Sequence, residues 1–306
     1  MIKIVTDSAS DMPAWIEEKY RLKIIPTPVV INGTDHLDRV SITTKEFYNL
    51  LDDKEIDIKT YHINEYMFTE SFRAYAQNGD EVLYLCFSTG IAGTFGAATL
   101  AYRDLLEEYP DFKMTIVDSH CASLGFGLLV YKLLLMQEQG APDALIKEAA
   151  VYYANNHIKH LFTVNTLYYL IKGGRISKVK GSVGEVLDVK PIIEVDETGA
   201  LRSLYSVRGR KKALKKLVEE ALKNGLDFSD TIVGIVHGED EESAVLFEEI
   251  MREQIKPARV IRSCVGCAIG AHTGRGILGF VFTDRDKEEY TAYQVLGRDE
   301  EGISAD

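Results

Sequence analysis

The chain has 306 residues, of which 46% are hydrophobic and 27% are charged. This composition is typical of a folded globular protein with a sizeable apolar core, and it excludes a disordered or low-complexity chain. A net charge of −12 argues against an extended nucleic-acid-binding surface. The length exceeds what one core usually accommodates, so we expect two packed lobes.

The opening residues enter a strand pattern directly, without a long apolar signal region. No later apolar run approaches the length of a membrane span. We therefore expect a cytoplasmic protein without a membrane span, for which transient membrane contact stays open.

The first half of the chain alternates strand, loop and helix patterns, which predicts an α/β unit with a parallel sheet. The expected strands are 2–6, 24–31, 81–87 and 112–117, and the expected helices are 13–20, 44–51, 65–77, 93–108, 123–137 and 142–156. Pro26 and Pro28 would be unfavourable in a central strand, so we expect a sheet edge or a bulge there.

The stretch 85–98, LCFSTGIAGTFGAA, ends an apolar strand in small polar residues and reopens as a helix. Such a loop exposes unpaired N–H groups beside the positive end of a helix, which indicates a site for a carboxylate or a phosphate. In the alternative interpretation, Ser88, Thr89 and Thr94 only cap the helix and the glycines only turn the chain.

Polar clusters follow three of the expected strands, at 6–8, 88–89 and 118–119. The carboxyl ends of parallel strands gather at one edge of an open sheet, where ligands bind. We therefore expect these three clusters to lie close together.

The pattern changes after residue 157. The expected strands are 162–165, 191–196, 201–207, 231–236, 260–262 and 277–282; the expected helices are 166–171, 183–189 and 208–222; and 271–276 is expected to be a polar loop. A Glu-Thr-Gly turn joins 191–196 to 201–207 as a hairpin. The sequence thus predicts an N-terminal parallel-sheet α/β domain, 1–157, and a C-terminal α+β domain with a mixed or antiparallel sheet, 158–306.

Four cysteines, Cys86, Cys121, Cys264 and Cys267, are too few for a disulfide scaffold. Cys264-x-x-Cys267 lacks a second ligand pair for zinc, although His272 lies nearby, and it also lacks a thioredoxin-like context. We expect plain buried thiols.

An enzyme is one alternative, because Asp7, Ser88, Asp118 and His272 could assemble into a hydrolase or phosphoryl-transfer site. The sequence has no Gly-x-Ser-x-Gly elbow, no lysine-bearing phosphate loop and no dinucleotide fingerprint. We therefore expect no intrinsic catalysis, no cofactor and no metal.

Several motifs occur together in a characteristic order. They are Thr6-Asp7-Ser8 with Asp11, the loop 88–94, Val117-Asp118-Ser119, the segment 167–177 with Gly173-Gly174-Arg175-Ile176-Ser177, Lys190-Pro191-Ile192-Ile193, and His272-Thr273-Gly274. In this order the chain resembles, nearly end to end, the DegV family of two-lobed fatty-acid-binding proteins. In bacteria that have the partner, these proteins act as the acyl carrier subunit of a fatty acid kinase.

The resemblance implies a long-chain fatty acid with its tail in an apolar tunnel and its carboxylate at the lobe interface. The family's head-group residues map to Thr60, Ala92 and His272, but Ala92 lacks the family's hydroxyl. Tyr61 and His62 stand where the family usually has serine and glutamine, and Arg275 replaces a usual proline. The predicted ligand-binding residues are Thr60, Tyr61, His62, Ser88, Thr89, Ala92, Gly93, Thr94, Ser119, His272, Thr273 and Arg275.

Two hypotheses about the head group follow from these departures. Tyr61, His62 or Arg275 could replace the missing hydroxyl, or the ligand is a different acid or lipid. Separately, the resemblance implies a kinase that docks on Arg175, Arg208 and Arg210. A sensor or carrier that works without any kinase is the further alternative.

Overall fold

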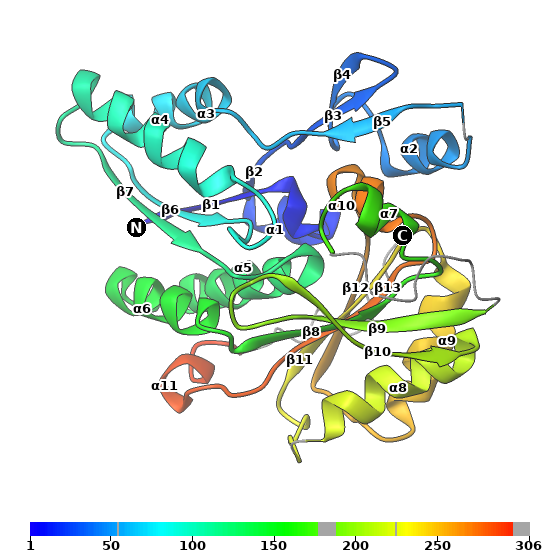
Figure 1. Ribbon diagram of the computed structural model, residues 1–306. Helices are drawn as coiled ribbons and strands as arrows, with labels where there is room; N and C mark the ends of the chain where they lie inside the picture. Colours follow the sequence, from blue (N-terminus) through cyan, green and yellow to red (C-terminus); the bar gives the residue numbers. More distant parts are fainter. Residues whose placement is uncertain (54, 177–187, 224, 296–306) are drawn as a thin grey trace.

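The computed structural model describes residues 1–53, 55–176, 188–223 and 225–295, and it has two lobes (Figure 1). The first lobe contains a four-stranded parallel sheet in the order β2-β1-β6-β7. Its strands are β1 (Lys3–Asp7), β2 (Lys23–Ile25), β6 (Glu81–Cys86) and β7 (Lys113–Asp118). One face packs on α3 (Glu65–Asn78) and α4 (Thr94–Glu108). The predicted parallel α/β lobe is confirmed.

The second lobe is built on a six-stranded mixed sheet in the order β10-β9-β8-β13-β11-β12. Its strands are β8 (Ile158–Thr163), β9 (Val189–Val195), β10 (Leu201–Arg208), β11 (Ile232–His237), β12 (Arg259–Cys264) and β13 (Leu278–Thr283). Only the pairing of β11 with β12 is parallel. The expected hairpin and the expected mixed sheet are both confirmed.

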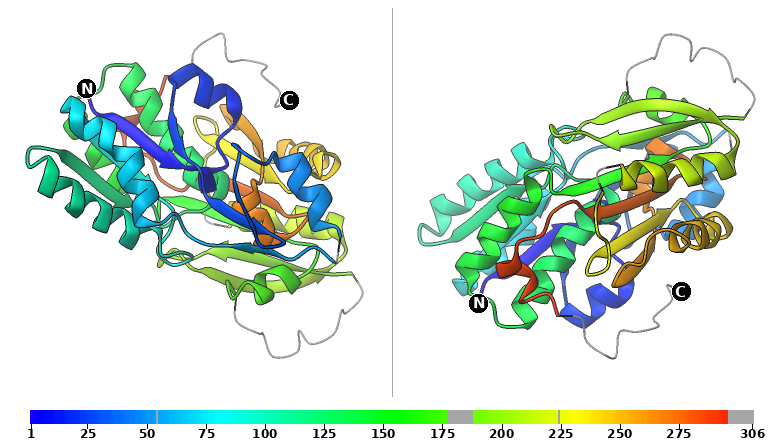
Figure 2. Two further views of the ribbon diagram at one scale, coloured as in Figure 1. Left: turned by 90° about the horizontal axis from the view of Figure 1, so that it is seen from above. Right: turned by 90° about the horizontal axis from the view of Figure 1, so that it is seen from below.

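Helices cover both faces of this sheet. The outer face packs on α8 (Arg210–Leu222) and α9 (Glu241–Arg252), which lie side by side when the molecule is seen from below (Figure 2). The inner face packs on α5 (Ser123–Glu138). No described helix is long and apolar enough to cross a membrane.

Helix α5 lies between the two large sheets and is buried along nearly its whole length. It is apolar around its circumference, because it is covered on every side. The same buried cluster contains Leu85 of β6, Leu129 of α5 and Val281 of β13. One core therefore runs through both lobes, and α6 (Asp143–Ala154) and α1 (Ala14–Tyr20) border it.

A third, antiparallel sheet of order β4-β3-β5 was not predicted. It consists of β3 (Pro28–Ile31), β4 (Thr34–Leu37) and β5 (Ile58–Thr60), and it lies beside α2 (Thr44–Leu51). The prediction of one strand over 24–31 was wrong, because the chain leaves the parallel sheet before Pro26 and starts β3 at Pro28. Thr43 caps α2 in a capping box.

The remaining elements are short. They are the 3-10 turn η1 (Ser8–Ser10), α7 (Tyr168–Lys172), α10 (Cys267–Thr273) and α11 (Glu288–Thr291). Part of the expected loop 271–276 is helical, because α10 continues to Thr273 before Gly274 ends it. Of the helix expected over 183–189, residues 183–187 lie outside the described residues, and Val189 begins β9.

Candidate ligand-binding site

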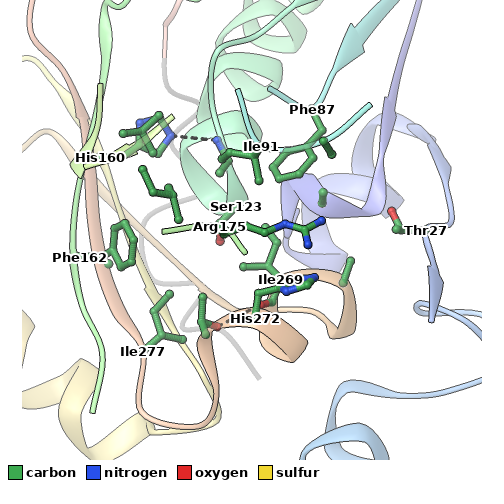
Figure 3. Close-up of a pocket in the computed structure, with 18 of the residues that line it drawn as sticks. Thr27, Phe87, Ile91, Ser123, His160, Phe162, Arg175, Ile269, His272 and Ile277 are labelled. Atoms are coloured by element: carbon green, nitrogen blue, oxygen red, sulfur yellow. Dashed lines mark hydrogen bonds between the residues drawn. The ribbon is translucent and has the colours of Figure 1, made fainter. Parts of the chain in front are cut away.

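A cavity lies between the lobes, with a volume of about 930 Å³ that includes open solvent at its mouth. Figure 3 shows part of its lining. Its wall contains apolar side chains from β8, α7, β11, α10 and β13 and the segment before β13. Examples are Phe162, Leu170, Val236, Ile269, Ile277 and Val281. This lining is typical of a pocket for a small, largely apolar molecule.

Thr60 and His272 form a hydrogen-bonded pair in the cavity wall. Thr60 ends β5 and His272 lies in the last turn of α10, and Thr60 Oγ1 is 2.7 Å from His272 Nε2. Burial, with a smaller contribution from Arg175, lowers the pKa of His272 to about 4. The imidazole is therefore neutral at neutral pH, and its buried Nδ1 has no hydrogen-bond partner among the described residues.

Arg175 brings a positive charge into the same wall. Its guanidinium donates a hydrogen bond to the Gly173 carbonyl at 2.6 Å. Burial lowers its pKa, and no carboxylate in the described part of the chain forms an ion pair with it. A half-buried cation without a counterion is electrostatically unfavourable, so the site is suited to an anion.

The Gly173-Gly174 pair explains how Arg175 and His272 come close together. A Cβ atom on Gly173 would overlap Nδ1 of His272, so any other residue at this position would displace the imidazole. Gly174 has a φ of +69°, a conformation that favours glycine. The sequence indicated the end of a helix here but not this close approach.

Tyr61 and His62 follow β5 and line the cavity near Thr60. The Tyr61 hydroxyl donates to Asp35 at 3.3 Å. The His62 ring lies beside Gly93, where a Cβ atom would be 3.7 Å from it.

Ala92, Thr94 and Thr273 also line the cavity. With Thr60, Tyr61, His62 and His272, seven of the predicted ligand-binding residues therefore lie in its wall. Ala92 contributes a methyl group. The Thr273 hydroxyl is engaged with the Ile269 carbonyl at 3.1 Å.

The loop 88–92 lies against the second lobe and does not form an open anion site. Ser88 is buried, and its hydroxyl donates to the Gly199 carbonyl at 2.8 Å. The N–H groups of residues 88–92 donate to Cys121, Asp118 and Ser88 itself. The hydroxyl of Thr89 also reaches Asp118.

Ser119 is buried as well, and its hydroxyl accepts from the Cys121 N–H at 3.1 Å. The expected meeting of the strand ends does occur, since the Phe87 N–H reaches Asp7 at 3.3 Å and Thr89 reaches Asp118. These groups satisfy one another within the first lobe, and only the Ser88 hydroxyl among these polar groups reaches the second lobe, at Gly199.

The other arginines named from the sequence, Arg275, Arg210 and Arg208, are not among the residues that line the cavity. Arg275 forms ion pairs with Asp52 at 3.0 Å and with Glu239 at 2.5 Å, so its charge is already neutralised outside the cavity wall. Arg210 pairs with Asp240 at 3.2 Å. Arg208 is exposed at the end of β10.

The arrangement of the polar groups does not favour the hydrolase hypothesis. Asp118 stands between Thr89 and His120, so the carboxylate and not the imidazole contacts the hydroxyl. Asp7 is buried and accepts hydrogen bonds from Tyr84, Ala9 and Phe87, and burial raises its pKa to about 6. No cluster of three potential ligands within the described ranges has a geometry that would hold a metal ion.

All four cysteines are free thiols. Cys86, Cys121 and Cys267 are buried and Cys264 is half-buried. Burial raises the pKa of Cys264 to about 12 and that of Cys267 further. Both thiols are therefore protonated and unreactive, as expected for buried cysteines.

Of the cavity residues of α10, His272 and Thr273 were predicted and Ile269 was missed, as were the cavity residues of the sheet. Ile269, His272 and Thr273 have the i, i+3, i+4 spacing that places side chains on one helix face, and all three line the cavity. That signal was readable, but Gly274 and Gly276 favoured a loop over 271–276.

A largely apolar cavity whose polar end holds a cation with no counterion in the described part of the chain is typical of a protein that binds a small amphipathic anion. A model of the DegV family, described as uncharacterised proteins, matches residues 1–285. A DegV domain-containing protein of Clostridium perfringens is 35% identical over 289 residues, covering 93% of this chain and 98% of that protein. The chain belongs to the DegV family, as its motifs indicated.

Two similar solved structures come from proteins that are described as binding fatty acids. One is a Thermotoga maritima protein whose structure is described as revealing a fatty acid binding function; it is 27% identical, with a TM-score of 0.81, covering 93% of this chain and 99% of that one. The other is a stearic acid-binding protein from Eubacterium ventriosum; it is 27% identical, with a TM-score of 0.83, covering 95% and 100%.

Proposed function

We propose that this protein binds one long-chain fatty acid, with the acyl tail in the cavity and the carboxylate beside Arg175, His272 and Thr60. The observation that carries the proposal is the Arg175 guanidinium, a cation in a largely apolar wall that forms no ion pair with any carboxylate of the described residues. A bound carboxylate would supply the missing charge. The fatty acids bound by the Thermotoga and Eubacterium relatives support the same ligand class.

The Thr60–His272 pair can donate to a carboxylate in one tautomer of the neutral imidazole. If Nε2 carries the proton and donates to Thr60, the hydroxyl proton is left for the ligand. In the other tautomer the proton lies on Nδ1, which is buried against Gly173. A donor is therefore available without protonating His272, whose pKa of about 4 keeps it neutral. This compensates for the hydroxyl that Ala92 lacks.

The tail supplies most of the binding free energy. Each methylene transferred from water to an apolar wall contributes roughly 0.8 kcal/mol. A long chain therefore retains useful affinity after the loss of its own freedom, while the head-group contacts fix its orientation.

Arg175→Gln tests the proposal, with Arg275→Gln as the matched control. Removing a charged hydrogen-bond partner costs about 1.5–3 kcal/mol, so Arg175→Gln should weaken palmitate binding by roughly 10- to 150-fold. Arg275→Gln should leave the affinity within about twofold, because Asp52 and Glu239 already hold that arginine outside the cavity wall. Equal affinities for both variants, measured by calorimetry, would contradict the proposed head-group site.

We further propose that, in the cytoplasm, the protein presents the bound carboxylate to a fatty acid kinase and catalyses no step itself. Arg208 is exposed on the rim of the second lobe, and Lys211, Lys212 and Lys215 of α8 are exposed next to it in the sequence. In a chain of net charge −12, this basic surface suits an acidic partner. Arg210 joins it, although Asp240 partly neutralises its charge.

Charge reversal at Arg208 and Lys211 tests the docking surface. The double variant should lose kinase-dependent acyl phosphate formation while keeping wild-type affinity for palmitate. Unchanged turnover would contradict the docking surface, and loss of palmitate binding together with turnover would indicate a damaged fold instead.

A further inference from the structure

Gly279 of β13 leaves one position in the cavity wall without a side chain. Its direct cross-strand partners are Phe162 of β8 and Val236 of β11, and both also line the cavity. Opposed residues of antiparallel strands share a face of the sheet. These three residues form one row across the sheet. The row presents the Phe162 ring, a gap at Gly279 and the Val236 isopropyl group to the cavity.

The backbone does not require glycine at this position. The φ angle of Gly279 lies outside the left-handed region, so any residue could adopt its conformation. Glycine inside a strand weakens the strand and often marks a place where another molecule approaches closely. The space around Gly279, and not its backbone conformation, therefore explains why this position has no side chain.

Gly234 of β11 can be compared with Gly279, because both are strand glycines on the same face of the sheet. Gly234 is paired with Val281, two residues along the strands from the pair of Val236 with Gly279. Leu124 of α5 fills the space there, and a Cβ atom on Gly234 would be 2.8 Å from Leu124 Cδ2. Around a Cβ atom on Gly279, the three nearest atoms of the described chain are Val236 Cγ1 at 2.8 Å, Phe162 Cβ at 3.6 Å and a backbone oxygen at 4.0 Å. All three belong to the sheet, so no described residue of α5 fills this gap.

We infer that the acyl chain crosses β13 at Gly279, and that the missing side chain sets the chain lengths that the cavity accepts. The inference rests on the proposed fatty acid binding and names the residue that selects among fatty acids. Figure 3 shows Phe162, the neighbour of Gly279, on a different wall from Arg175 and His272. With the carboxylate at Arg175, the methylenes at Gly279 belong to the tail.

Dissociation constants for lauric acid and stearic acid test this inference in wild-type protein and three variants. One misplaced methylene in an apolar pocket changes affinity by roughly 10- to 200-fold. Gly279→Val should therefore lower the stearic-to-lauric affinity ratio by at least about tenfold, and Gly279→Ala should lower it by less. Adding Val236→Ala to Gly279→Ala removes the crowded methyl group and should return the ratio toward the wild-type value.

Gly96→Ala on α4 is the control, because a Cβ atom there would have no neighbour within 4 Å, and it should leave the ratio unchanged. If Gly279→Val does not fold, Gly279→Ala and the double variant still decide the question. An unchanged ratio in folded Gly279 variants would overturn the inference alone. Wild-type protein that binds neither acid would instead overturn the proposed function.

Discussion

Replacing Gly173 by alanine tests the contact that places His272 in the cavity wall. A Cβ atom at this position would overlap Nδ1 of His272, and the φ of −78° allows alanine without backbone strain. The imidazole must therefore turn away, which breaks its 2.7 Å hydrogen bond with Thr60.

The expected cost follows from three contributions. Overpacking a close contact costs about 1–3 kcal/mol, and loss of the Thr60–His272 hydrogen bond costs about 0.5–1.5 kcal/mol. Replacing glycine lowers the entropy of the unfolded chain and returns about 0.4–1 kcal/mol. We expect a net loss of about 2 kcal/mol in the free energy of unfolding.

Urea unfolding of Gly173→Ala, His272→Ala and the double variant measures this coupling, with palmitate affinity as a second observable. Because His272→Ala removes the clashing ring, the double variant should be more stable than the sum of the single effects by at least about 1 kcal/mol. Additive effects within about 0.5 kcal/mol, with unchanged palmitate affinity in Gly173→Ala, would refute the contact.

Three other predictions concern the fold. Ser88→Ala removes the hydrogen bond to Gly199 and should lower the free energy of unfolding by about 1–3 kcal/mol; a urea midpoint equal to the wild type would contradict this contact between the lobes. Burial raises the pKa of Asp11 from 3.8 to about 8, so the folded state holds a proton that the unfolded state has lost, and stability falls as pH rises between those values. Asp11→Asn should flatten that decline in thermal unfolding scans. An equal slope of stability against pH in the variant and the wild type would contradict this role of Asp11. Lys132→Met leaves the half-buried Asp286 without its cation and should lower the free energy of unfolding in urea by about 3 kcal/mol. A loss below about 1 kcal/mol would show instead that the pair behaves like a surface ion pair.

The sequence predicted the large sheets and long helices because each has a local signal. The run 81–87 is apolar over a strand length, and α4 keeps helical spacing from Thr94 to Glu108. The third sheet has strands of only three or four residues, too short for periodicity to be read. Pro26 and Pro28 predicted a sheet edge or a bulge, and β2 is indeed an edge strand, but the passage of the chain from one sheet to another was not predicted.

The site was predictable only in part, because its contacts join residues far apart in the chain. Thr60 and His272 were named from motif positions, and the structure brings them together across 212 residues. The loop at Ser88 has the local pattern of an anion site, yet the β9–β10 turn and Asp118 occupy its polar groups. Arg175 was assigned to a docking surface, and only the packing of α7 against α10 shows that it lines the cavity.

Native mass spectrometry of the purified protein, followed by solvent extraction of the bound material, tests the central claim most directly. The account predicts a complex carrying one long-chain fatty acid per protein chain, with a mass that identifies its length. A protein that is empty, and that fails to take up added palmitate or stearate, would contradict the account.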